Sequence, residues 1–377
     1  FGMTSRQPRF PREAYRQLYE PKAGPLWSAA TGLGPEEDGD HYLPESDFFE
    51  WWYFDAAFTN GYTLVAVLHS SLYNAVDHKP TVDLRVYAPD GRRWLGIGRF
   101  GREAMTSSGE RCDVRIADCH ARGDGPYYEL RLHQGEVEAE LEFRGSVPGW
   151  KPGSGYLFRD QASERFFRWA VPLPRAKVTG RLRVGEETLD VVGQGYHDHN
   201  WGSVYLPAAF SRWTWGRVLA GDWTLIFGDV VGRGTSPLHV TPFMLARGDE
   251  ILLGSDRIHV GDDDPAREPR TGAGYFRCLR LSTVEGPDLE LTLTTRRAID
   301  ALDFAAPHLP LTCHHRLRGA AENVFYLAQG VPVAGRLAAW LLGKGSYLRC
   351  EADYRLELSD YDDVVKTGQA LYEIMIL

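Results

Sequence analysis

Ten residues near the middle of the chain, 193–202, place an acid, two imidazoles, an amide, a phenol and an indole between glycines. Such side chains can hold and move protons on a bound molecule. The candidate catalytic residues are Tyr196, His197, Asp198 and His199, and the candidate substrate contacts beside them are Asn200 and Trp201. Residues 188–192 predict a strand that leads into this run, and the flanking glycines permit a tight backbone. We therefore expect an active-site corner at a strand end.

Two other interpretations of this run stay open. His, Asp and Asn are common in turns, where their side chains bond local backbone groups. His197 and His199 also have the His-x-His spacing that puts two imidazoles on one side of a strand, as metal ligands require. Three distant histidines could supply a third ligand, namely His239, His314 and His315. No Glu or third His follows at close spacing, so we favour organic acid–base chemistry and predict no metal.

The composition predicts two globular domains and argues against a nucleic-acid partner. A chain of 377 residues exceeds the size at which one hydrophobic core usually keeps growing, and 43% hydrophobic residues supply material for two cores. The formal net charge of −9 and the lack of a dense Lys/Arg run argue against a phosphate-binding surface. We expect no nucleic acid among the partners.

The cysteines and the first residues bear on location. The five cysteines are odd in number and form no Cys-x-x-Cys pair, which fits free or buried thiols in a reducing compartment. Residues 1–20 are rich in Arg and lack a continuous apolar core, so we expect neither a signal peptide nor a transmembrane segment. We predict a cytoplasmic protein whose oligomeric state the sequence leaves open.

Short alternating runs separated by turn residues extend along most of the chain. Residues 128–133 and 136–143 alternate strictly between apolar and polar residues, which predicts a hairpin with one wet face. Residues 177–184 and 188–192 form a second predicted hairpin, which delivers the polar run. Many short strands with little helix predict an all-β protein built from two antiparallel β-barrel or sandwich domains with minor helix.

The domain boundaries follow from changes in this pattern. We expect an N-terminal arm over residues 1–45, a first β domain over 46–205 and a second over 206–377. The polar run then lies at the seam between the domains, where ligand pockets are common. Residues 261–274 are predicted to form an exposed loop, and residues 322–343 one or two helical turns.

Aromatic residues make up 12% of the chain and include eleven Trp, which indicates a pocket for a flat or unsaturated ligand. On a strand, Trp51 and Tyr53 point to one face and Trp52 and Phe54 to the other, and core packing explains them equally well. The candidate substrate contacts of this kind are Trp51, Tyr53, Trp169, Trp213, Trp215 and Arg217. Asp198 in such surroundings would lose hydration, which raises its pKa unless a protonated histidine beside it opposes the shift.

Three of these segments together resemble the carotenoid 1,2-hydratase (hydroxyneurosporene synthase) family, which includes lipocalin-like Diels–Alderases. The segments are Gly195–Gly202, Trp213-x-Trp215-Gly-Arg217 and Glu50–Asp55. The resemblance covers nearly the whole chain and implies two lipocalin-like β domains, a ligand pocket between or within them, and no metal or organic cofactor.

The resemblance also bears on the site residues. A Tyr-x-Asp pair of the hydratases falls on Tyr196 and Asp198, and a His-x-Trp pair falls on Phe167 and Trp169. The histidine is therefore missing, which puts a water-adding mechanism in doubt, since only His197 or His199 could replace it. The remaining histidines at positions 69, 78 and 120 are assigned structural roles.

We expect an enzyme of specialised metabolism that binds a polyene-bearing polyketide or isoprenoid and promotes its intramolecular cyclisation. Asp198 and His199 would polarise a substrate carbonyl, Tyr196 would donate a further hydrogen bond, and the indoles would clamp the chain in a reactive fold. One alternative is hydration of a C=C bond, in which Asp198 protonates the alkene, Trp169 and Trp201 shield the cation, and water bound by His197 or His199 captures it. Another is a non-catalytic lipid or pigment carrier.

Overall fold

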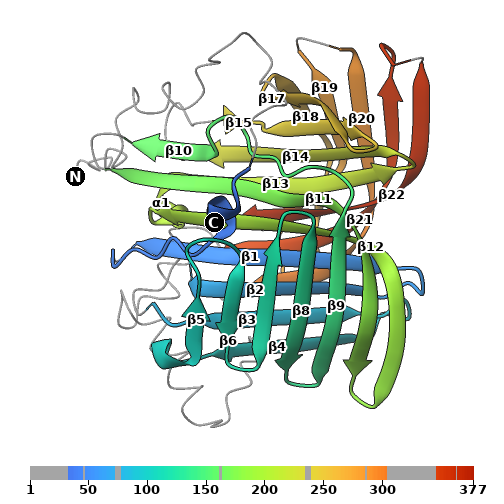
Figure 1. Cartoon of the computed structure of the whole chain (residues 1–377). Coiled ribbons are helices and arrows are strands. Elements are labelled where there is room, and N and C mark those ends of the chain that lie inside the picture. The colour runs from blue at the N-terminus through green and yellow to red at the C-terminus, as the bar shows by residue number, and fades with distance from the viewer. Residues whose placement is uncertain are drawn as a thin grey trace, which may run out of the picture.

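The computed structural model describes residues 33–45, 47–72, 78–160, 164–233, 239–284, 287–303, 345–361 and 363–377. The predicted helical turns at 322–343 and the ligand roles considered for His314 and His315 lie outside the described residues. Two antiparallel sheets make up nearly all of the described structure (Figure 1).

The first sheet has 12 strands in the order β4-β3-β2-β1-β12-β11-β9-β8-β7-β6-β5, with β10 paired to β11. Its strands are β1 (Phe48–Phe58), β2 (Thr63–Ser71), β3 (Thr81–Tyr87), β4 (Arg93–Arg99), β5 (Met105–Ser107), β6 (Asp113–Ile116), β7 (Cys119–Asp124), β8 (Tyr127–Gln134), β9 (Val137–Gly145), β10 (Tyr156–Asp160), β11 (Arg165–Val184) and β12 (Glu187–Ser203). Both predicted hairpins are confirmed, because β8 pairs with β9 and β11 pairs with β12.

The second sheet has 10 strands in the order β17-β16-β14-β13-β22-β21-β20-β19-β18, with β15 paired to β14. Its strands are β13 (Phe210–Ala220), β14 (Trp223–Gly232), β15 (His239–Val240), β16 (Phe243–Arg247), β17 (Glu250–Ser255), β18 (Ile258–Arg267), β19 (Gly274–Thr283), β20 (Leu289–Asp303), β21 (Ser346–Leu358) and β22 (Val364–Ile376). The described helices are short: η1 (Pro35–Asp38), η2 (Arg102–Ala104) and α1 (Leu206–Ala209). The prediction of an all-β protein with minor helix is confirmed.

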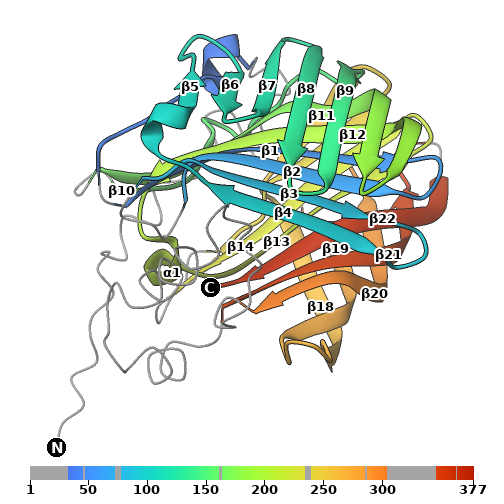
Figure 2. The same cartoon turned by 90° about the horizontal axis from the view of Figure 1, so that it is seen from below.

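Three apolar cores hold the sheets. One lies inside the curl of the first sheet, a second inside the curl of the second sheet, and the third is shared between them. Figure 2 shows strands β1–β4 between strands β5–β9 and the second sheet. Trp52 and Phe54 of β1 face the inner core, whereas Trp51 and Tyr53 face the shared core, as their alternation predicts.

The chain passes from one sheet to the other between β12 and β13, at residues 204–209. We propose the two sheets as the two domains expected from the sequence. Among the described residues, no helix is long and apolar enough to cross a membrane.

Two local predictions are wrong. Most of the loop expected at 261–274 is strand, because β18 runs to Arg267 and pairs with β19. The run 193–202, expected to form a corner at a strand end, is the second half of β12 and lies in the middle of the first sheet. Its glycines serve close packing of strands rather than a bend, since a Cβ at Gly193 would lie 2.1 Å from the Ala57 carbonyl oxygen.

Buried ions join the two sheets. Arg349 of β21 is fully buried and donates to Tyr53 Oη at 2.8 Å and to Asp55 Oδ2 at 3.3 Å, both on β1. It also pairs with Glu373 of its own sheet, and Arg217 of β13 pairs with the second oxygen of Asp55. When one ion of a buried pair is removed, the other stays buried without a counter-charge, which is strongly destabilising. These side chains therefore fix how the second sheet lies on β1.

Replacing Arg349 by Met should lower the free energy of unfolding by about 3–5 kcal/mol, because the buried Asp55 and the partly buried Glu373 would lose their shared cation. The matched control is Arg355→Met on the same strand, where the loss of a solvent-screened pair with Glu357 should leave stability nearly unchanged. Urea unfolding of both variants measures the difference. Equal losses in the two variants would show that the buried ions do not hold the sheets.

Candidate functional site

Strand alternation divides the polar run of β12 between two faces of the first sheet. Tyr196, Asp198 and Asn200 face the core shared by the two sheets, whereas His197 and His199 face the interior of the first sheet. The expectation that these side chains converge at one corner is wrong. A two-residue period sends neighbours to opposite sides, so a ligand beside Asp198 has the sheet itself between it and both imidazoles.

Asp198 is the centre of the polar group on the shared face. Its Oδ2 accepts hydrogen bonds from Tyr196 Oη at 2.8 Å and Trp169 Nε1 at 3.1 Å, and its Oδ1 accepts one from Asn200 Nδ2 at 2.7 Å. All four side chains are buried. Trp169 stands directly across from Asn200 on β11, so three alternate positions of β12 and one position of β11 build the arrangement.

Burial governs the acidity of this group. Desolvation raises the pKa of Asp198 to about 7, although the hydrogen bonds from Tyr196 and Trp169 and the charge of His197 oppose the rise. The expected increase is therefore confirmed. Burial likewise raises the pKa of Tyr196 well above its usual value, so its phenol stays a donor. A carboxyl with a pKa near neutrality can give or take a proton under physiological conditions.

Indoles of both sheets border this group. Trp51 of β1 and Trp213 and Trp215 of β13 are partly exposed and pack against the shared core. The Trp215 ring lies 4.8 Å from that of Tyr196, and Tyr53 lies 5.5 Å from Trp215. These candidate contacts thus share one core with Tyr196 and Trp169, the hydrogen-bond donors to Asp198.

Two candidate contacts have structural partners. Arg217 pairs with Asp55 and is buried, and the Tyr53 hydroxyl lies 2.8 Å from Glu373 Oε1. Both side chains belong to the ionic group that joins the sheets. Trp201 faces the other side of β12, where its ring stacks on His41 at 4.1 Å and lies 4.8 Å from His199.

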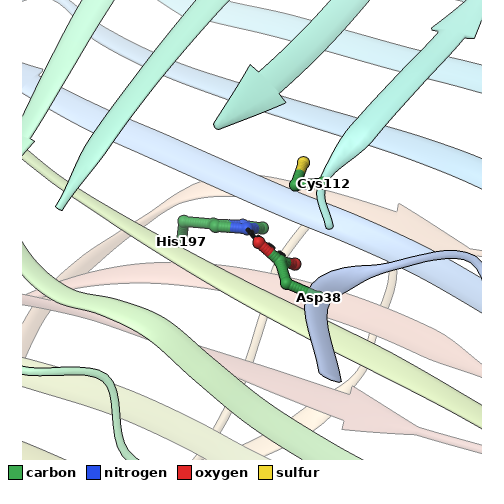
Figure 3. A group of neighbouring side chains, drawn as sticks. All are labelled: Asp38, Cys112 and His197. Carbon is green, nitrogen blue, oxygen red and sulfur yellow. Dashed lines mark hydrogen bonds and ion pairs between the residues drawn. The ribbon is translucent and has the colours of Figure 1, made fainter. Parts of the chain in front are cut away.

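The inner face of β12 holds a second polar group, closed by residues before β1. His197 donates from Nδ1 to the Tyr53 carbonyl oxygen at 2.9 Å and meets Asp38 through Nε2 at 3.0 Å. Asp38 ends η1, and Tyr128 donates to it at 2.5 Å. Figure 3 shows His197 and Asp38 pointing at one another, with Cys112 close by.

His199 completes the inner group. Its Nδ1 lies 3.1 Å from the Glu37 carbonyl oxygen and its Nε2 lies 3.3 Å from Glu50 Oε1. Burial lowers the pKa of His199 to about 4 and raises the pKa of Glu50 well above its usual value. His199 is therefore neutral at pH 7, and its hydrogen bond to the Glu37 carbonyl anchors the arm segment to β12.

One group among the described residues has ligand atoms close enough for a metal ion, namely Asp38, Cys112 and His197, within 4.8 Å of one another. The residues fit an ion poorly. Both ring nitrogens of His197 face oxygen acceptors, an arrangement that an imidazolium with two N–H donors satisfies. Burial also raises the pKa of Cys112 well above its usual value, which keeps the thiol protonated. His239, one of the histidines that could have supplied a third ligand, instead forms a hydrogen bond with Asp229 in the second sheet.

A cavity of about 370 Å³ opens beside the inner group, at the η1 end of the first sheet. Its lining includes Leu33, Pro35, Asp38, Tyr128, Val147 and Pro172. None of the Asp198 group contributes to it. The cavity therefore offers a ligand a location separate from the indole-bordered face.

Sequence reasoning missed Asp38 and set aside His69. Asp38 lies in an acidic stretch assigned to the arm, and no local pattern shows that its carboxylate reaches β12. His69 lies on β2 opposite Trp51, and the alternation around Val65 and Val67 could have placed it on the shared face.

The AttH-like family profile matches residues 89–308. The chain belongs to the AttH-like family. It is 36% identical over 237 residues to a hydroxyneurosporene dehydrogenase of Chlorobaculum tepidum, covering 52% of this chain and 60% of that protein. It is 27% identical over 199 residues to an acyclic carotenoid 1,2-hydratase of Thiocapsa roseopersicina, covering 48% and 47%. The chain thus spans about half the length of these curated relatives.

Solved structures share the fold of this AttH-like chain. A putative AttH from Nitrosomonas europaea superposes with a TM-score of 0.61 at 17% identity, covering 92% of this chain and 97% of that one. CghA in complex with Sch210972 gives a TM-score of 0.59 at 13% identity, covering 92% and 96%. The lipocalin-like fold and the predicted family resemblance are confirmed.

The pKa of Asp198 has a measurable effect on stability. Its native value of about 7 exceeds the ordinary value of 3.8, so between these values the folded chain holds a proton that the unfolded chain has lost. The resulting stabilisation is complete below about pH 4 and is lost as the pH rises through 7. Relative to Asp198→Asn, the wild type should lose roughly 2–3 kcal/mol between pH 5 and pH 8.

Urea unfolding of both proteins across this range measures that change. Asp190→Asn is the matched control, because Asp190 lies on the same strand with a side chain that is 90% exposed. The control should show no comparable pH-dependent difference. A constant difference between wild type and Asp198→Asn would mean that Asp198 is ionised throughout.

Proposed function

We propose that this chain is an enzyme of specialised metabolism that binds a hydrophobic, unsaturated small molecule against the shared face and promotes its intramolecular cyclisation. The observation that carries the proposal is the buried Asp198 carboxyl, with a pKa of about 7, whose partners Tyr196 and Trp169 share a core with the partly exposed Trp51, Trp213 and Trp215. The curated relatives named after carotenoid reactions support an unsaturated substrate. The reacting centre lies beside Asp198.

The hydrogen bonds of Asp198 decide which oxygen faces the substrate. Oδ2 already accepts two, from Tyr196 and Trp169, whereas Oδ1 accepts only one, from Asn200. The protonated form therefore carries its hydrogen on Oδ1. That O–H donates to a substrate carbonyl and draws electron density from the conjugated alkene, while the indoles hold the chain folded.

In the cyclisation step, two carbon–carbon σ bonds form at the expense of two π bonds within one molecule. No atom enters or leaves. Asp198 keeps its proton, which only forms a hydrogen bond to the substrate carbonyl. The product is an isomer of the substrate. Catalysis then consists mainly of positioning and of polarising the carbonyl.

Hydration is the second candidate, and the hydratase named among the relatives favours it. Asp198 would transfer its proton to an alkene carbon, the indole faces would stabilise the cation, and water would add and return a proton to the carboxylate. His197 and His199 cannot bind that water, since they face the other side of β12. This separation is why cyclisation is the lead proposal.

The test is mass spectrometry of extracts after incubation with linear polyene polyketides and acyclic carotenoids in H₂¹⁸O. The proposal expects an isomer of unchanged mass, and a product heavier by one labelled water would replace it with hydration. Asp198→Asn should retain a measurable fraction of a cyclisation rate but lose nearly all of a hydration rate. Asp190→Asn should leave either rate unchanged, and binding without any product would favour a carrier.

A further inference from the structure

One row of side chains crosses four strands on the shared face. His69 of β2 stands opposite Trp51 of β1, Trp51 opposite Asn200 of β12, and Asn200 opposite Trp169 of β11. Alternation places His69 on the same face as Val67, which packs against the shared core. Adjacent strands lie about 4.8 Å apart, so roughly 10 Å separates the backbones of His69 and Asn200.

The imidazole of His69 is buried without a complete set of partners. His69 is 8% exposed, and its Nδ1 makes no hydrogen bond to any described residue. The ring lies 6.1 Å from that of Trp51. Burial lowers the pKa of His69 to about 4, and the charge of Arg85 adds to this while Asp83 opposes it. At pH 7 the ring is therefore neutral.

A buried polar atom that lacks a partner is destabilising, whereas an apolar side chain of similar shape would pack against Trp51 and Val67 without that loss. A neutral imidazole offers one donor and one acceptor, and it can satisfy either a hydroxyl or a carbonyl oxygen. An unsaturated hydrocarbon would leave Nδ1 unpaired. A substrate with an oxygen at that point would satisfy it.

We propose that His69 binds an oxygen function of the substrate, so that the enzyme acts on an oxygenated polyene and discriminates against the corresponding hydrocarbon. The inference rests on the proposed function, because it places the substrate along the row from His69 to Trp169. His69 lies about two strand spacings, roughly 10 Å, from Asn200, the member of the row that bonds Asp198. His69 is a specificity residue and takes no part in proton transfer.

The first test compares farnesol with (E)-β-farnesene, two probes of equal carbon number of which only the first has a hydroxyl. Quenching of tryptophan fluorescence reports binding. Wild type should bind farnesol about fivefold more tightly, the size that one net hydrogen bond gives. His69→Phe should remove this preference while leaving affinity for the hydrocarbon equal or higher, and His69→Gln should retain part of it.

Controls separate this inference from the proposed function. His133→Phe, at a histidine of β8 whose side chain is 50% exposed, should keep the preference. Asp190→Asn, at an exposed position of β12 outside the proposed site, should also keep it. A failure of the proposed function would appear only in the product assay.

Two results would overturn the inference. One is a preference for farnesol that persists in folded His69→Phe. The other is a wild type that binds neither probe, because the inference requires an accessible space beside His69. If His69→Phe does not fold, the ¹⁵N resonances of the wild-type imidazoles decide. The His69 nitrogens should shift with farnesol and not with farnesene, and equal or absent shifts would refute the proposal.

Discussion

Strand β12 carries buried polar side chains on both faces in the middle of a 12-stranded sheet. Because these side chains are removed from water, the protein must supply hydrogen-bond partners for them on each face. On the inner face, the short helix η1 brings the Asp38 carboxylate to His197. On the outer face, Trp169 of β11 donates to Asp198. The rest of the architecture follows from this requirement, because the arm covers one face and the second sheet covers the other.

The second sheet does more than cover β12. Its buried Arg349 binds Asp55 and Tyr53 of the first sheet, which sets the indoles of β13 beside Asp198. The same coverage removes water from the carboxyl, and desolvation is the largest cause of its raised pKa. Stability and chemistry thus depend on one interface, and a looser contact between the sheets would return Asp198 towards an ordinary acid.

The sequence predicts the fold class well, because period-two alternation and glycine turns are local signals that β8, β9 and β13 obey. It also identifies Asp198, Tyr196 and Trp169, although their roles remain proposals. It does not predict features that depend on contacts between segments far apart in the sequence. The glycines at 193 and 195 look like turn residues but allow close approach of neighbouring strands, and Asp38 reaches β12 across a gap of 159 positions in the sequence.

We propose that substrate binds on the face shared by the sheets and not in the cavity of the first sheet. Photolabelling with a diazirine derivative of geranylgeraniol, followed by peptide mapping, tests it most directly. We expect cross-links on peptides that contain Trp51, Trp213 or Met375, which are partly exposed and pack against the shared core. Cross-links confined to peptides with Leu33 or Val147, at the cavity beside Asp38, would contradict it.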